Sequence, residues 1–327
     1  MSGKAALGPV VEHVRANAGR YLGVEAAPDK VEIDVIPVGK RARTRLNRLE
    51  VGVGGRHLRL IVKETSLADA PEARGDGGGR PRLTVVEDHL ERHRWEYLGL
   101  RAAEERFEAL QDSRFAVLRA IDHLPAQRAF LIEEVPHPTL RDLLTAPARL
   151  TPSGRRRIRA ATENAGAWLR EFHALDAGDA GDAGAPPLRA SATEVEAALH
   201  EQAEFALRHG GGRSVERATA RAVVAIADGA LPDPLPLGLW HADFAPRNMF
   251  VTPTGAVAGF DMAARRRAPV YEDIAYFVMN LRRLRSRGAN RFLAGYFGTD
   301  PIPERALAVF DLLVRLDERN RRSTEKA

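Results

Sequence analysis

The stretch HADFAPRN, residues 241–248, restricts the fold and chemistry of this chain more than any other stretch of similar length. It lies between two short apolar runs, residues 237–240 and 249–251, that are typical of strands. A polar turn that caps a hairpin and a catalytic loop are both compatible with this position. The residue types favour the loop, because a histidine, an aspartate and an asparagine at fixed spacing provide more functional groups than a turn requires.

Phosphoryl transfer to a hydroxyl requires groups of the kind that this stretch contains. A carboxylate must orient the hydroxyl and accept its proton, and oxygen ligands must hold Mg²⁺ beside the phosphates. Asp243 and Asn248 are five residues apart on one loop. A following hairpin, with its turn at Thr254-Gly255, returns the chain to Asp261. We therefore expect Asp261 to lie beside Asn248.

The nucleotide phosphates also need a cation, and Lys63 is the candidate. Alternation in HLRLIVKE, residues 57–64, places Leu residues on one face of a strand and Lys63 on the other. Lys63 is one of only five lysines among 49 basic residues. A cation in a cleft needs a carboxylate partner, which the next helix supplies as Glu96, with Glu104 and Glu105 as alternatives.

The order of predicted elements indicates an α+β fold with two lobes. A small antiparallel sheet with one long helix comes first, and mostly helices follow Pro136. We expect an N-terminal nucleotide-binding lobe at residues 1–135 and a C-terminal catalytic and acceptor-binding lobe at 136–327. The strands of the first lobe are predicted at 31–39, 46–53, 57–64, 115–121 and 129–135, and its helices at 9–24 and 86–110.

These features resemble the aminoglycoside phosphotransferase and choline kinase group, the small-molecule branch of the protein-kinase-like fold. The matching segments cover residues 30–280 in the family's order: IVKE with Lys63, WEYLGL with Glu96, LIEEV, WLREFH, and HADFAPRN followed by GFD.

The resemblance implies a phosphotransferase that uses ATP and Mg²⁺. Asp243 would be the catalytic base, and Asn248 and Asp261 would be the Mg²⁺ ligands. Lys63, paired with Glu96, would bind the nucleotide phosphates. Two further sites are implied: adenine would bind the backbone near Glu133 and Val135, and the loop that contains Gly39 would cover the phosphates.

Three positions depart from the family pattern. Ala242 stands where the family usually has glycine, and Asp261 is followed by Met262 in place of tryptophan or phenylalanine. The phosphate-covering loop has a single glycine, Gly39, before the basic run at residues 40–45.

Several conspicuous residues are predicted to be structural. His241, at a strand end, is expected to hydrogen-bond the backbone, and Asp273 to cap or brace the helix that follows it. His173 lies on an apolar helix face and is expected to pack in the core. Trp168 and Phe172 are expected to be core residues as well.

The charge distribution bears on the acceptor. The chain has a net charge of +5, but its arginines alternate with acidic residues along helices, so a nucleic-acid partner is not expected. The arginines at 265–267 fit a solvated turn and contact with an anionic acceptor equally well. Residues 262–327 contain 14 Lys and Arg against 8 Asp and Glu. A sugar or polyol hydroxyl is therefore favoured as acceptor over a cationic aminoglycoside.

Composition excludes other classes of protein. The absence of cysteine excludes disulfides, thiolate metal sites and cysteine nucleophiles. No apolar run approaches the roughly 20 residues of a membrane span, and the first residues lack the apolar segment of a signal peptide, so a cytoplasmic location is expected. A nucleotide-binding regulator without transfer activity is the alternative function. The identity of the acceptor, the choice between ATP and GTP, and the oligomeric state remain open.

Overall fold

A five-stranded antiparallel sheet forms the first lobe. The computed structural model describes residues 7–41, 44–65, 80–83, 92–176, 186–262 and 266–325. The strands lie side by side in the order β1-β2-β3-β5-β4. Their bounds are β1 Glu32–Arg41, β2 Thr44–Val53, β3 Arg56–Thr65, β4 Ala120–Leu124 and β5 Ala129–Glu133.

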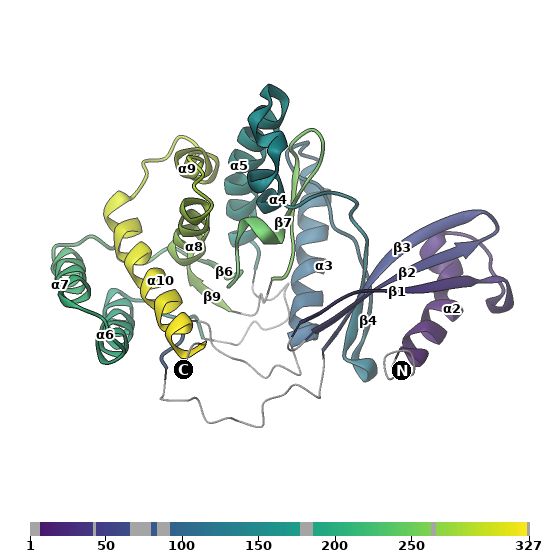
Figure 1. Cartoon of the computed structure of the whole chain (residues 1–327), viewed down its shortest axis with the longest axis horizontal. Helices are drawn as coiled ribbons and strands as arrows, with labels where there is room; N and C mark the ends of the chain where they lie inside the picture. Colours follow the sequence, from purple (N-terminus) through teal and green to yellow (C-terminus); the bar gives the residue numbers. More distant parts are fainter. Residues whose placement is uncertain are drawn as a thin grey trace.

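Helices cover the two faces of this sheet. Helix α2 (Gly8–Leu22) packs Val10 and Val14 against Leu60 and Val62 of β3, and all four side chains are buried. The alternation of β3 turns Lys63 toward the opposite face, where α3 (Arg92–Leu110) lies between the sheet and the second lobe (Figure 1). The predicted start of this helix, at residue 86, lies outside the described residues.

The strand predicted at residues 115–121 is wrong, because the fourth strand begins only at Ala120. Phe115 instead forms a bridge with Val257 of the second lobe, and the amide of Ala116 donates to the carbonyl of Val257. Alternating apolar residues marked an extended segment correctly, but its hydrogen-bond partner is the other lobe. The segment therefore ties the lobes together before the chain enters the sheet.

The second lobe is mainly helical, with two short two-stranded sheets. Strand β6 (Leu237–Leu239) pairs with β9 (Arg267–Pro269), and β7 (Met249–Val251) pairs with β8 (Val257–Gly259); of the two pairs, only β7–β8 is a hairpin. The helices are α4 Leu140–Thr145, α5 Pro152–His173, α6 Ala192–Arg208, α7 Arg213–Ala227, α8 Val270–Arg283, α9 Ala289–Phe297 and α10 Glu304–Glu325. The α+β, two-lobed fold is confirmed, while the lobe boundary at residues 135 and 136 stays a prediction.

Helix α5 is the central element of this lobe. Thr151 caps its first turn by accepting a hydrogen bond from the amide of Gly154, and Pro152 occupies the first helical position. Trp168 and Phe172 are buried, as predicted. Strand β8 crosses directly over Trp168, and a Cβ on Gly259 would lie 2.5 Å from that ring. Only glycine fits there, which brings the end of β8 close to the helix.

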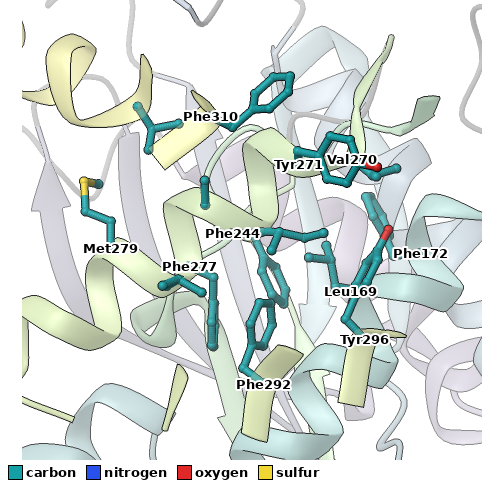
Figure 2. Close-up of a cluster of buried hydrophobic side chains, with 14 of the residues drawn as sticks. Leu169, Phe172, Phe244, Val270, Tyr271, Phe277, Met279, Phe292, Tyr296 and Phe310 are labelled. Carbon is teal, nitrogen blue, oxygen red and sulfur yellow. The ribbon is translucent and has the colours of Figure 1, made fainter. Parts of the chain in front are cut away.

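Aromatic side chains from four elements fill the core beside α5. Phe244, Phe277 and Phe292 stack with centroid separations between 4.3 and 6.3 Å. Figure 2 shows the three rings together, with Phe172 and Tyr296 nearby. Phe244 belongs to the HADFAPRN loop, so this packing fixes the loop to the core. Among the described residues, none of the helices combines the length and apolarity that a bilayer span requires.

Candidate active site

The loop HADFAPRN is held from behind by Asp273, in the first turn of α8. The Asp273 carboxylate accepts hydrogen bonds from the amides of His241, at 2.8 Å, and Ala242, at 3.1 Å. It also contacts Nε2 of His173 at 3.2 Å, while Nδ1 of His173 contacts the Tyr296 hydroxyl at 2.8 Å. All of these groups are buried except Ala242, which is half-buried. Asp273 therefore braces the loop, and His173 is the packed core histidine that was predicted.

The side chain of His241 plays a structural role, but not through the predicted hydrogen bond to the backbone. Neither ring nitrogen has a hydrogen-bond partner among the described residues. The ring instead lies among Trp168, Phe172 and Phe244, at centroid separations of 5.2 to 6.2 Å. Burial lowers the pKa of this imidazole, because the charged form would lose its hydration. His241 is therefore a neutral packing residue.

The loop turns sharply at Ala242, whose φ is 67°. This left-handed conformation costs a residue with a Cβ roughly 1–2 kcal/mol. Glycine adopts it freely, which explains why the family usually has glycine at this position. Ala242 keeps the turn at an energetic cost, and the bonds to Asp273 offset that cost.

The Asp243 carboxylate lies at the front of the loop and is partly exposed, with 30% of the side chain accessible. Arg247 donates to Oδ1, and Nδ2 of Asn248 donates to Oδ2 at 2.9 Å. Each carboxylate oxygen keeps a second lone pair. The carboxylate is therefore oriented by two neighbours and still has acceptor capacity on its exposed side.

The β7–β8 hairpin brings Asp261 back to Asn248, as the spacing predicted. Met249 lies opposite Gly259, and the amide of Phe260 donates to the carbonyl of Asn248 at 3.0 Å. Asp261 has φ of 65° and, like Ala242, is one of six described non-glycine residues with a positive φ. Backbone strain of this kind concentrates at functional sites.

Lys63 connects the two lobes at this point. Its Nζ lies 2.5 Å from Oε2 of Glu96 and also contacts Oδ1 of Asp261. Burial acts to lower the pKa of Lys63, but the two carboxylates outweigh burial and raise the pKa above its ordinary value. Lys63 is therefore charged. Glu104 contacts Arg101 and the amide of Ala120, and Glu105 contacts Arg101, so neither is the partner of Lys63.

Arg92 is a cation of this cluster that the sequence analysis missed. Its Nε donates to Oε1 of Glu96 at 2.6 Å, so Glu96 bridges Lys63 and Arg92. The charge of Glu96 and, more weakly, those of Asp261 and Asp243 raise the pKa of Arg92 above its ordinary value. The i,i+4 spacing of Arg92 and Glu96 on a helix was the available signal.

Arg247 was also missed, although it belongs to the quoted stretch. Besides Asp243 it contacts the Tyr276 hydroxyl on α8, at 3.4 Å. Burial would lower the pKa of Arg247, but Asp243 and Tyr276 raise it overall. The four-residue spacing from Asp243 was the available signal.

Asn248 and Asp261 offer the kind of donor atoms that Mg²⁺ prefers. The amide nitrogen of Asn248 donates to both the carbonyl and the carboxylate of Asp243, at 2.9 Å each. The side-chain oxygen Oδ1 of Asn248 is thus the atom left to bind a cation, on the strand end that the hairpin places beside Asp261. A carboxylate and a carboxamide oxygen suit a hard cation that also binds phosphates. These residues therefore fit a magnesium ion.

The segment expected to bind adenine follows β5 at the junction of the lobes. The backbone amide of Glu133 donates to the carbonyl of Arg119, and that of Glu134 to the carbonyl of Arg59. The side chain of Glu134 forms an ion pair with Arg48 through both carboxylate oxygens. The amide of Val135 has no hydrogen-bond acceptor within the described ranges.

Gly39 lies in β1 next to a bulge, opposite Leu46. It is therefore in the first hairpin of the sheet, where the phosphate-covering loop was expected.

The arginines at 265–267 differ from one another. Arg265 lies outside the described residues. Arg267 lies in β9 and donates to the carbonyl of Leu237 at 2.9 Å, while the carbonyl of Arg266 accepts from Trp240. The β6–β9 strand pair thus accounts for part of this basic segment.

Comparison with known proteins identifies the family. Residues 53–308 match the model of the phosphotransferase enzyme family. A comparison with curated proteins found no match.

Solved structures of phosphotransferases share the fold. A macrolide 2'-phosphotransferase of type I covers 98% of this chain and 97% of its own, at 15% identity and a TM-score of 0.57. The macrolide 2'-phosphotransferase of Brachybacterium faecium covers 93% and 88%, at 15% identity and a TM-score of 0.53. An aminoglycoside 2'-phosphotransferase in complex with GDP covers 88% and 83%, at 13% identity and 0.52. At these identities the similarity establishes the fold.

Proposed function

Because this chain belongs to the phosphotransferase enzyme family, we propose that it transfers the γ-phosphoryl group of ATP to a hydroxyl of a small molecule. The observation that carries the proposal is a chain of contacts: Lys63 contacts Asp261, the β7–β8 hairpin holds Asp261 beside Asn248, and Asn248 donates to Asp243. A sugar or polyol is the favoured acceptor.

Asp243 is the proposed catalytic base. Its carboxylate orients the acceptor hydroxyl and takes the proton as the oxygen attacks phosphorus. Hydrogen bonds from Arg247 and Asn248 support this role, because they fix the carboxylate plane while part of the side chain stays accessible.

Lys63 and Arg92 are the proposed phosphate-binding cations. Both are bonded to Glu96. Because Glu96 is 1% exposed, water cannot take the place of either cation beside its carboxylate. A cation held in this way needs no reorganisation when charge builds up on the transferred group. Lysine provides a point charge and arginine a planar fork, so the two can bind different phosphate oxygens.

Mg²⁺ bound by Asn248 and Asp261 would neutralise charge on the phosphates. Lys63 contacts Asp261 directly, so it also orients that carboxylate.

Adenine is proposed to bind at the backbone of Glu133 and Val135, where the Val135 amide offers a donor. The half-buried rings of Phe250 and Phe260 stack at 4.3 Å, adjacent in sequence to Val251 and Asp261, and would give the cleft an apolar floor. Gly39 would let the first hairpin approach the phosphates closely.

An ATP-consumption screen against pooled sugars, polyols, amino alcohols and nucleosides tests this function. The parent protein should consume ATP with at least one pool, and Asp243→Ala should not. Asp300→Ala, which removes an exposed aspartate, is the matched control and should retain full activity. Binding of Mg·ATP without any product across the screen would contradict the proposal and favour a nucleotide-binding regulator.

A further inference from the structure

Helices α8 and α10 form a basic cavity in the second lobe. It has a volume of about 380 Å³ and is lined by Arg283, Arg315, Arg319, Arg322 and Ser323. The three arginines of α10 are spaced by four and three residues, so they lie along one face of that helix. Figure 1 shows α10 lying alongside α8.

The cavity carries more positive charge than its own ion pairs neutralise. Arg283 and Arg322 both bond to Glu318, which also accepts from Arg321. Arg315 contacts Asp311, which is shared with Arg282. Arg319 donates to a backbone carbonyl, that of Gly210. Among the described residues, the four lining arginines thus share two carboxylates, those of Glu318 and Asp311, so the cavity keeps a net positive charge.

The same face of α8 connects this cavity to the candidate active site. Tyr276 precedes Arg283 by seven residues, which is two helical turns or about 10 Å along the axis. The Tyr276 hydroxyl contacts Arg247, which contacts Asp243. Burial, then the charge of Asp243 and, more weakly, that of Glu318 raise the pKa of Tyr276. Tyr276 therefore lies between the HADFAPRN loop, which it contacts through Arg247, and the turn of α8 that carries Arg283.

We propose that this cavity binds a phosphate monoester carried by the acceptor, while a hydroxyl of the same molecule lies at Asp243. This inference rests on the proposed function and names its substrate class. Guanidinium groups bind phosphate through paired hydrogen bonds, and several of them suit a dianion better than a single carboxylate. In a sugar or polyol phosphate the hydroxyl and the phosphate are separated by several bonds, so one molecule can present the two groups to different side chains.

The reaction would convert a phosphorylated acceptor into a bisphosphate. The acceptor oxygen bonds to the γ-phosphorus, the bond from that phosphorus to the β,γ-bridging oxygen breaks, and the hydroxyl proton passes to Asp243. ADP leaves with the bridging oxygen.

Calorimetric titration tests the cavity with defined probes. The probes are inorganic phosphate and three matched pairs: ribose and ribose 5-phosphate, glucose and glucose 6-phosphate, glycerol and glycerol 3-phosphate. Mg²⁺ and a saturating non-hydrolysable ATP analogue keep the nucleotide site filled. At least one phosphorylated member should bind ten-fold more tightly than its neutral partner.

Substitution of the cavity arginines should remove this preference. In Arg315→Gln/Arg319→Gln the affinity for the phosphorylated probe should fall at least ten-fold, with the affinity for the ATP analogue unchanged. Arg305→Gln, at an exposed position of the same helix, is the matched control and should bind as the parent does. If the double variant unfolds at a lower temperature than the control, Arg315→Gln alone should still weaken binding about three-fold.

Two results would overturn the proposal. One is that no phosphorylated probe binds better than its neutral partner, or that its binding survives the arginine substitutions. The other is tighter binding of duplex DNA than of any probe, lost in the same variant, which would assign the cavity to a nucleic-acid backbone. Transfer to neutral acceptors alone would overturn this inference and leave the proposed function standing. If the parent protein transferred phosphate to no acceptor but still bound the phosphorylated probe in the cavity, the proposed function would be contradicted and the phosphate site would stand.

Discussion

Two polar clusters lie on either side of the catalytic loop, and they differ in how completely their groups are satisfied. The cleft cluster comprises Lys63, Arg92, Glu96 and Asp261. The loop brace comprises Asp273, His173, Tyr296 and the amides of His241 and Ala242. The side chains of Lys63 and Asp261 are 17% and 14% exposed, against 5% and 2% for His173 and Asp273.

This difference separates the groups that we propose to take part in the reaction from the groups that hold the loop in place. In the brace every side chain has a hydrogen-bond partner within the brace and is buried, so none of them faces a ligand. In the cleft cluster the two cations share carboxylates. A metal can replace a cation as the partner of a carboxylate, and a phosphate can replace a carboxylate as the partner of a cation. A ligand can thus change the partners of the cleft cluster without leaving any charge buried and unpaired.

Breaking the brace should have the largest effect on stability. Asp273→Ala removes the acceptor of three donors: the amides of buried His241 and half-buried Ala242, and the ring of His173. Each lost bond costs about 1–3 kcal/mol. The free energy of unfolding in urea should fall by about 3–5 kcal/mol, and activity should fall with it. Asp300→Ala is the control. A loss below about 1 kcal/mol would show that the loop does not depend on Asp273.

Breaking the cleft cluster should affect the rate far more than the fold. In Lys63→Met the carboxylate of Glu96 keeps Arg92 as partner, so the free energy of unfolding should change by less than about 1 kcal/mol. The kcat/KM for ATP should drop by about 100-fold or more, because a preorganised cation is lost. Lys30→Met, at an exposed lysine, should leave both unchanged. A three-fold effect or less would remove Lys63 from the phosphate site.

The buried imidazole of the loop should make stability pH-dependent. Because burial lowers the pKa of His241 in the folded protein, the unfolded chain binds the extra proton below about pH 6.5. Stability should therefore fall as the pH decreases below that value, by up to about 1.4 kcal/mol per pH unit.

Urea unfolding at pH 7, 6 and 5 measures this slope. His241→Phe should make it shallower by that amount, whereas His200→Phe, at an exposed site, should not. Parallel pH profiles for His241→Phe and the parent would contradict the assignment.

The smallest effect is expected from relaxing the turn itself. Ala242→Gly removes the cost of a left-handed residue with a Cβ, so the free energy of unfolding should rise by about 0.5–1 kcal/mol. Chemical denaturation is the measurement. A decrease in stability would mean that contacts of the Ala242 methyl group outweigh the strain.

The same contrast explains what could be predicted from the sequence. Asp243, Asn248 and Asp261 lie on one loop and one hairpin, so their convergence followed from local spacing. Lys63 followed from strand alternation and from the rarity of lysine. These short-range patterns were sufficient to predict the family and the two-lobed fold.

Long-range contacts could not be predicted in this way. Asp273 was assigned to its own helix because nothing local shows that it reaches back to the amides of His241 and Ala242. The strand at 115–121 was misplaced because alternation of apolar and polar residues predicts a strand but does not show which segment it pairs with. The arginines of α8 and α10 share a cavity only because the helices pack together.

The central claim is that Asp243 acts in the reaction and Asp273 only supports it. Activity and the free energy of unfolding measured side by side for Asp243→Ala test this claim most directly. We predict that kcat falls by about 10²–10⁴-fold while the free energy of unfolding stays within about 1 kcal/mol of the parent. Retention of kcat in a folded Asp243→Ala protein would contradict the account.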